Sequence, residues 1–160
     1  MRKIRVLFVD DEEKFLRSTT KRLEMRELEV HPFTNGADAL KAADATAFDV
    51  ALVDLKMPGM DGEELLARLK QKHPLVEVVF LTGHGSVASA VRATQAGAYE
   101  YLQKPCELDD VLTVLTKAYG KHVAAKDTVE ESEVEALMKK AVGMGPVALL
   151  EQLRKLAHRG

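Results

Sequence analysis

IRVLFVDDEEKF, residues 4–15, joins an apolar run to four consecutive acids. The run is apolar almost throughout, which is typical of a strand covered on both faces of a sheet. Asp10 and Asp11 come where that strand ends, and Glu12 and Glu13 follow them. A turn from strand to helix does not require so much negative charge. We therefore interpret the first two acids as half of a metal site and the next two as first-turn helix acids.

The same change from an apolar run to a helical pattern repeats along the chain. Short apolar runs predict strands, and a 3.6-residue period predicts helices between them. The expected strands are 4–9, 30–33, 50–55, 76–81 and 99–102, and the expected helices are 12–26, 36–45, 61–72, 86–96 and 107–124. Five strands alternating with five helices favour an α/β fold with an open parallel sheet. Sites in such folds lie beyond the carboxyl ends of the strands.

The composition is that of a globular protein with a hydrophobic core. The 160 residues are 46% hydrophobic and 30% charged, and a net charge of -2 provides no basic field for nucleic acid. Cys106 is the only cysteine, which excludes an internal disulfide and fits a reducing compartment. The apolar stretches fall short of the roughly 20 residues of a membrane span, and the N-terminus does not resemble a signal peptide. We therefore expect a cytoplasmic protein without membrane contact.

Polar residues stand at the ends of four of the predicted strands. Asp10 and Asp11 follow the first strand, Asp54 ends the third, Thr82 follows the fourth and Lys104 follows the fifth. Parallel strand ends meet at one edge of a sheet, so we expect one shared pocket. Converging carboxylates suit Mg²⁺, and a carboxylate can attack phosphorus to give an aspartyl phosphate. A lysine and a metal would neutralise phosphoryl charge, and a hydroxyl can hydrogen-bond a phosphoryl oxygen.

Four motifs carry a family resemblance: "VDD", "DLKMPGMDG", "LTGHG" and "YLQKP". In combination, over about residues 3–124, they resemble the receiver domain of bacterial two-component response regulators. The stretches "TGHG" and "GAYEYLQKP" are similar to receivers attached to sigma-54 activators. The resemblance implies a flavodoxin-like, doubly wound α/β fold with a five-stranded parallel sheet in the order 2-1-3-4-5.

The resemblance also implies roles for the residues at the strand ends. Asp54 would accept a phosphoryl group from a sensor histidine kinase, and Thr82 and Lys104 would contact that group. The implied ligands of Mg²⁺ are Asp10, Asp11, Asp54 and the backbone carbonyl of Lys56. In this family the Lys104–Pro105 peptide bond is cis.

A conformational switch is the second implication of the resemblance. Tyr101 matches the switch aromatic, which turns inward as Thr82 moves toward the phosphoryl group. Phosphorylation adds roughly -1.5 to -2 charge at pH 7. The fourth helix, fifth strand and fifth helix would then change their contacts with an output protein or a second copy. We expect a signalling domain that catalyses only its own phosphorylation and dephosphorylation.

Residues 125–160 are interpreted as a C-terminal amphipathic extension of a receiver domain at 1–124. "TVEE" (128–131) offers a capping box and "GMGP" (143–146) interrupts an apolar stripe, which predicts a helical hairpin. Two short helices cannot bury their apolar faces alone, so the hairpin should dock on the main domain, on a partner or on a second copy. From Lys126 onward there are six basic and six acidic residues, which predicts no direct DNA binding.

Several alternatives stay open from the sequence. The chain could be a receiver taken from a longer transcriptional regulator, its tail being the start of a linker. A Mg²⁺-dependent aspartyl-phosphate phosphatase would place an Asp-x-Asp pair after the first strand, a spacing that Asp10–Asp11 lacks. A flavin-binding module would not need acids and a lysine at the strand ends. Asp61 is predicted to cap a helix, and His31, His73, His122 and His158 are interpreted as structural or exposed.

Overall fold

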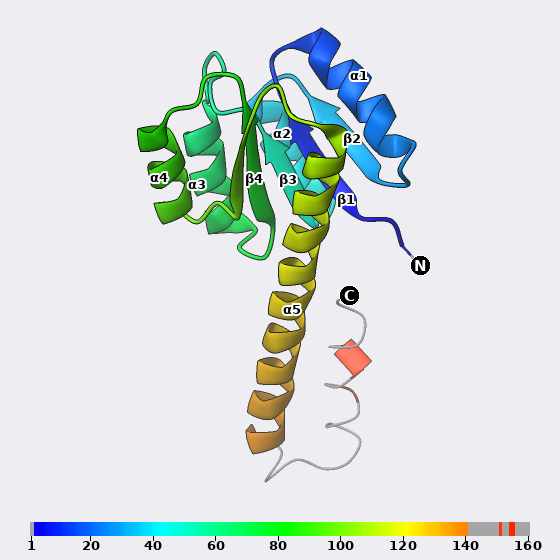
Figure 1. Ribbon diagram of the computed structural model, residues 1–160. Helices are drawn as coiled ribbons and strands as arrows, with labels where there is room; N and C mark the ends of the chain where they lie inside the picture. Colours follow the sequence, from blue (N-terminus) through cyan, green and yellow to red (C-terminus); the bar gives the residue numbers. More distant parts are fainter. Residues whose placement is uncertain (1, 141–150, 152–153, 156–160) are drawn as a thin grey trace. The chain divides into compact units, whose positions relative to one another are not determined.

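The computed structural model describes residues 2–140, 151 and 154–155 of the chain. Strands and helices alternate along it (Figure 1). The elements are β1 Arg5–Val9, α1 Glu13–Glu24, β2 Glu29–Phe33, α2 Gly36–Ala45, β3 Val50–Val53, α3 Gly62–Lys72, β4 Glu77–Thr82, α4 Val87–Gln95, β5 Glu100–Gln103 and α5 Leu108–Lys140. All five strands are parallel, in the order β2-β1-β3-β4-β5, which confirms the expected flavodoxin-like topology.

Helices cover both faces of the sheet, which explains the continuous apolar runs. Successive strand side chains point to opposite faces. Leu7 of β1 and Phe80 of β4 therefore pack in one buried cluster with residues of α2, α3 and α4. Phe8 and Leu81, one position along, pack in a second cluster with residues of α1 and α5. The strand ends consequently form the part of the sheet where polar side chains can gather.

Side-chain caps begin three of the helices. The Asn35 side chain accepts a hydrogen bond from the Asp38 backbone at the start of α2. Asp61 accepts one from the Glu64 backbone at 2.9 Å, which confirms the predicted cap of α3. At α4, a serine pair at 86 and 89 forms a capping box. These caps satisfy N–H groups that the first helical turn leaves without partners.

α5 is one continuous helix of 33 residues, so the prediction of a separate helix beginning at Thr128 is wrong. The Thr128 hydroxyl donates to the Ala124 carbonyl at 3.0 Å, a bond made inside a helix rather than at its start. No glycine or proline stands between Lys121 and Lys140 to end the helix. The predicted break at 143–146 and the second helix of the hairpin lie outside the described residues.

The chain divides into two compact units, Met1–His122 and Val123–Gly160. The strands and their polar ends all belong to the first unit. Within the described part of the chain, every helix is too short or too polar to cross a membrane.

Gly62, the first residue of α3, is required by close packing against the third strand. Its N–H donates to the Leu55 carbonyl at 2.8 Å. A Cβ at this position would lie 2.4 Å from the Asp54 carbonyl oxygen and 2.9 Å from the Phe80 ring. We expect Gly62→Ala to lower the free energy of unfolding by about 3 kcal/mol, because neither the backbone nor the buried ring can yield freely.

Urea denaturation measures this loss, and Gly120→Ala is the matched control. A Cβ on Gly120, inside α5, would meet nothing within 4 Å. The control should therefore stabilise the protein by about 0.5–1 kcal/mol through helix propensity. Equal stability of the two variants would contradict the packing described for Gly62.

Candidate functional site

Hydrogen bonds carry the sheet ladder one residue past the strands and so fix the strand-end side chains. The Asp54 N–H, just after β3, donates to the carbonyl of Val9 at 2.9 Å. The Lys104 N–H, just after β5, donates to the carbonyl of Thr82 at 2.9 Å. Asp10 directly follows β1, which pairs with β3, the strand that ends just before Asp54. The four predicted strand-end positions are thus held at one edge by backbone geometry.

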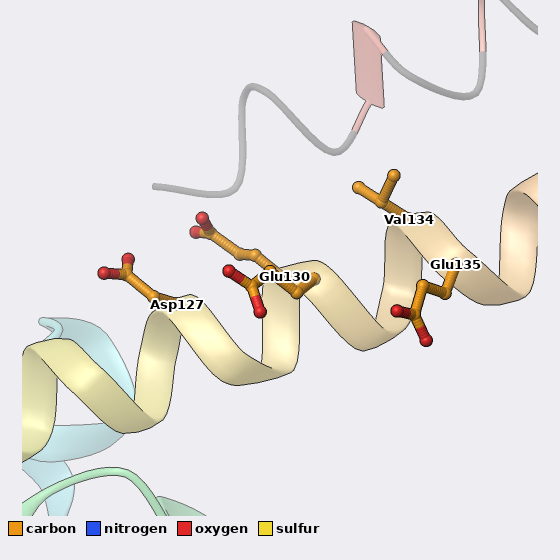
Figure 2. Close-up of a pocket in the computed structure, with 5 residues that line it drawn as sticks. Asp127, Glu130, Val134 and Glu135 are labelled. Atoms are coloured by element: carbon orange, nitrogen blue, oxygen red, sulfur yellow. The ribbon is translucent and has the colours of Figure 1, made fainter.

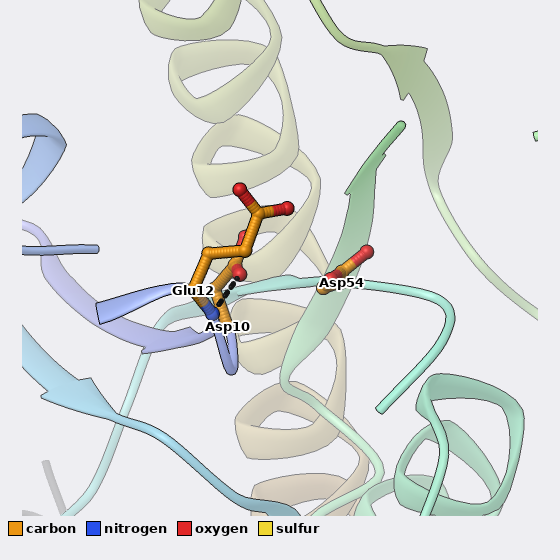
Figure 3. Close-up of side chains that lie close together, drawn as sticks. All are labelled: Asp10, Glu12 and Asp54. Atoms are coloured by element: carbon orange, nitrogen blue, oxygen red, sulfur yellow. Dashed lines mark hydrogen bonds between the residues drawn. The ribbon is translucent and has the colours of Figure 1, made fainter. Parts of the chain in front are cut away.

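Three carboxyl groups gather at this edge (Figure 3). Asp10, Glu12 and Asp54 each bring an oxygen to within 4.8 Å of the others. Asp10 Oδ1 accepts the Glu12 N–H at 2.9 Å. Asp54 is 1% exposed, and its Oδ1 has no hydrogen-bond partner. Buried polar atoms nearly always have partners, so this oxygen is suited to a cation or an incoming electrophile.

Lys104 supplies the positive charge of the site. Its Nζ lies 2.7 Å from Asp10 Oδ2 and 3.4 Å from Glu12 Oε1. The ammonium also lies 4.0 Å from the centre of the Phe15 ring, a cation–π contact. Burial lowers the pKa of Lys104, but the hydrogen bond and charge of Asp10 outweigh burial and raise it overall. The site therefore has one ammonium and three carboxyl groups, and a further cation would help to balance the negative charge.

The surroundings of Asp54 and Asp10 disfavour the ionised form of both carboxyl groups. Burial raises the pKa of Asp54, and the charge of Asp10 adds to that effect, while Thr82 and Lys104 oppose it. Burial likewise raises the pKa of Asp10 against the hydrogen bond from Lys104. A carboxylate that is costly to ionise is more basic and more reactive when ionised, and a cation would stabilise it.

Some of the residues predicted from the sequence lie together at the site, and others do not. Asp10, Asp54, Thr82 and Lys104 lie at the common edge, as the strand-end pattern predicts. Asp11 and Lys56 are exposed, and Asp11 stands outside the carboxyl cluster. Glu12, interpreted from the sequence as a first-turn acid, stands inside it. Its place in the acidic run was the only signal that could have identified it.

Comparison with protein-family models identifies the family of this chain. The response regulator receiver domain model matches residues 6–116, more than half of the chain.

The chain belongs to the response regulator receiver domain family.

Similar proteins agree with this assignment. The DNA-binding transcriptional regulator NtrC of Escherichia coli K12 is 43% identical over 86 residues, 54% of this chain and 18% of NtrC. The transcriptional regulatory protein GlrR of the same strain is 33% identical over 153 residues, 96% of this chain and 33% of GlrR. A receiver domain crystal structure from Methanospirillum hungatei JF-1 matches at TM-score 0.73 and 30% identity, covering 78% of this chain and 99% of that one. The chain spans a third or less of the curated relatives' length.

Tyr101 of this receiver domain is hydrogen-bonded to α4. Its hydroxyl lies 2.9 Å from Ser89 Oγ, which also donates to the Ser86 carbonyl at 3.0 Å. A serine hydroxyl has one hydrogen, so Tyr101 must be the donor when Ser89 donates to Ser86. A Cβ on Gly85 would lie only 2.2 Å from the Tyr101 hydroxyl oxygen. The absence of a side chain at residue 85 thus lets the tyrosine occupy this place.

A cis peptide bond and an acidic pocket are two further features of the chain. The Lys104–Pro105 bond is cis, as the family resemblance implies. On α5, an open pocket is lined by Asp127, Glu130, Glu131, Val134 and Glu135 (Figure 2). An acidic helix face of this kind is explained by solvation, and we assign it no role in the chemistry.

Proposed function

We propose that Asp54 is the phosphoacceptor of this receiver domain and that a sensor histidine kinase is the donor. The observation that carries the proposal is the buried Asp54 oxygen without a hydrogen-bond partner, beside Lys104 and Asp10. Family membership supports it, because receivers of response regulators act in two-component signalling. The chain is on this proposal a signalling domain whose only reactions are its own phosphorylation and dephosphorylation.

The transfer is a displacement at phosphorus. An Asp54 carboxylate oxygen forms the new P–O bond as the P–N bond of a phosphohistidine breaks. The electron pair returns to the imidazole nitrogen, and a proton from solvent neutralises it. Lys104 offsets charge on the phosphoryl oxygens, and the Thr82 hydroxyl donates a hydrogen bond to one of them. The raised pKa of Asp54 makes its ionised form a stronger nucleophile.

The carboxyl groups fit a bound Mg²⁺. Asp10 and Asp54 supply hard oxygen ligands from neighbouring strand ends, and the unpartnered Asp54 oxygen accords with a cation. Family resemblance adds Asp11 and the Lys56 carbonyl to the proposed ligand set. When bound, the metal would neutralise charge on the phosphoryl group.

The response passes, on this proposal, from the phosphoryl group to a protein-binding surface. Thr82 would follow the phosphoryl group, and Tyr101 would change its packing against α4. The surface of α4, β5 and α5 would then bind a protein partner or a second copy. We propose a receiver domain at 1–124 and an extension at 125–160, within a longer regulator like the NtrC and GlrR relatives.

Intact-mass spectrometry with a small phosphodonor tests the proposed function. The chain is incubated with acetyl phosphate, with and without Mg²⁺. We expect a mass gain of one phosphoryl group only when Mg²⁺ is present, and peptide mapping should assign it to Asp54. Uptake that does not require Mg²⁺, or that maps elsewhere, would contradict the proposal.

The metal ligands can be distinguished by a pair of matched variants. We expect Asp11→Asn to weaken Mg²⁺ binding at least about tenfold, since a ligand carboxylate is lost. Glu12→Gln should change affinity by less than about threefold, because its carboxylate pairs with Lys104 instead. Isothermal titration calorimetry with Mg²⁺ measures both. The reverse order of effects would move the ligand from Asp11 to Glu12.

The same titration has a predicted pH dependence. Burial raises the pKa of Asp10 and of Asp54, so both take up protons at a higher pH than an ordinary aspartate at about 4. Mg²⁺ and protons compete for these carboxylates. As the pH is lowered, the affinity for Mg²⁺ should therefore begin to fall before the pH reaches about 4. A flat affinity down to about pH 4 would contradict the raised values.

A further inference from the structure

A second buried cluster of charged groups lies at the amino-terminal ends of the strands, opposite the end where Asp54 lies. Asp49, which precedes β3, has a side chain 3% exposed. Arg2 donates to both of its carboxylate oxygens, at 2.8 and 3.1 Å, and the Arg5 backbone N–H donates at 2.8 Å. His122 of α5 adds a fourth contact, from Nε2 to Asp49 Oδ1 at 3.1 Å. His122 is only 7% exposed and is the last residue of the first compact unit.

Both ring nitrogens of His122 face groups that only accept hydrogen bonds. Nδ1 lies 2.5 Å from the Leu75 carbonyl oxygen, just before β4, while Nε2 faces Asp49. Burial alone would raise the pKa of Asp49, but hydrogen bonds from His122 and Arg2 outweigh it and hold the pKa far below its ordinary value. Asp49 is therefore a carboxylate at all ordinary pH values and cannot donate.

A neutral imidazole carries one N–H and could serve only one of these acceptors. The other nitrogen would then point a lone pair at an oxygen lone pair, in a buried site. We infer that His122 is held as the doubly protonated imidazolium. This charged ring fastens the turn of α5 that ends the first compact unit to the starts of β3 and β4. The fastening is pH-sensitive, because loss of one proton removes one of the two hydrogen bonds.

Groups of both charges lie around His122, and Asp49 is the carboxylate in contact with its ring. Tyr119 of α5 stacks on the ring, and Arg2 from the N-terminal segment shares Asp49 with it. The neighbouring Glu77 of β4, whose N–H donates to the Asp49 carbonyl at 3.3 Å, lies 3.7 Å from Lys70 of α3 and 3.6 Å from Lys121 of α5. At the starts of β1 and β2, Arg5 and Glu29 pair at 2.9 Å. Glu77 and Glu29 thus have cations of their own, whereas Asp49 contacts His122 directly.

The sign of the pH effect follows from these contacts. Asp49 and Leu75 stabilise the charged ring in the folded protein, so the folded state binds this proton more tightly than the unfolded state. The contribution to stability is complete at mildly acidic pH and is lost as the pH rises. Because the cluster and Asp54 lie at opposite ends of the strands, the fastening does not depend on the phosphoacceptor role.

NMR of the imidazole nitrogens in the wild-type chain tests the inference directly. At about pH 7.5 an ordinary histidine ring is about 90% neutral. We expect the ¹⁵N shifts of His122, whose two ring nitrogens face Asp49 and the Leu75 carbonyl, to be those of an imidazolium at that pH. A neutral His122 ring with a single N–H at neutral pH would overturn the inference.

Variants test whether the charge stabilises the fold. The unfolding equilibrium of wild type should shift at least about tenfold toward the unfolded state between about pH 6 and pH 9, relative to His122→Gln, which carries no titrating ring. His73→Gln is the control, because His73 pairs with the exposed Asp44 outside this cluster. Parallel pH curves for wild type and His122→Gln would count against the fastening. Should His122→Gln fail to fold, the wild-type NMR titration still decides the outcome.

Discussion

We expect the Asp54→Asn variant to take up no phosphoryl group when it is incubated with Mg²⁺ and acetyl phosphate. The amide cannot attack phosphorus, and no second carboxylate at this edge has an unpartnered buried oxygen among the described residues. Intact-mass spectrometry should show a complete loss of the added mass. This is the largest effect expected for a single substitution in the chain.

Loss of fold can be separated from loss of chemistry in this experiment. Burial raises the pKa of Asp54, so its ionised form costs free energy in the folded state at neutral pH. Asparagine avoids that cost, and the variant should resist urea at least as well as wild type. Asp61→Asn, at the exposed cap of α3, is the matched control and should retain full uptake. Undiminished uptake by Asp54→Asn would refute the assignment.

Replacing Lys104 with methionine should lower the free energy of unfolding by about 3 kcal/mol at neutral pH. The ammonium is 14% exposed and lies 2.7 Å from Asp10, whose side chain is 1% exposed. Removing it leaves a buried carboxylate without its cation. The pKa of Asp10, already raised by burial, should rise further, so the destabilisation should shrink as the pH falls and Asp10 takes up a proton. Urea titrations across this pH range measure the effect.

Mg²⁺ and a second lysine variant sharpen that test. A bound cation can replace the missing ammonium, so Mg²⁺ should recover part of the stability lost in Lys104→Met. Lys14→Met, on the exposed face of α1, should leave stability within about 0.5 kcal/mol of wild type. Unchanged stability of Lys104→Met at neutral pH would mean that the pair with Asp10 does not form in solution.

The sheet and the strand-end residues could be predicted from the sequence because both depend on local patterns. Continuous apolar runs mark strands buried on both faces, and parallel strands bring their carboxyl ends together whatever the sequence separation. Asp54 and Lys104 are therefore placed correctly by pattern alone, and Asp61 is recognised as a cap by its position before Gly62.

Other features depend on packing that leaves no local mark. Glu12 joins the site because Lys104, 92 residues away, extends toward it. His122 is fixed by the Leu75 carbonyl, 47 residues away, and carries no motif. Thr128 resembles a helix cap, yet an uninterrupted run of helix-forming residues continues through it. Each of these outcomes is decided by long-range contacts or by the sum of propensities, not by a recognisable short pattern.

The close approach of Gly85 and Tyr101 has an evolutionary consequence. A methyl group at residue 85 and the tyrosine hydroxyl would occupy the same volume, since the two would lie 2.2 Å apart. Substitutions at these two positions are therefore expected to covary among related receivers. Where residue 85 is larger, the aromatic ring must adopt another rotamer or give way to a smaller side chain.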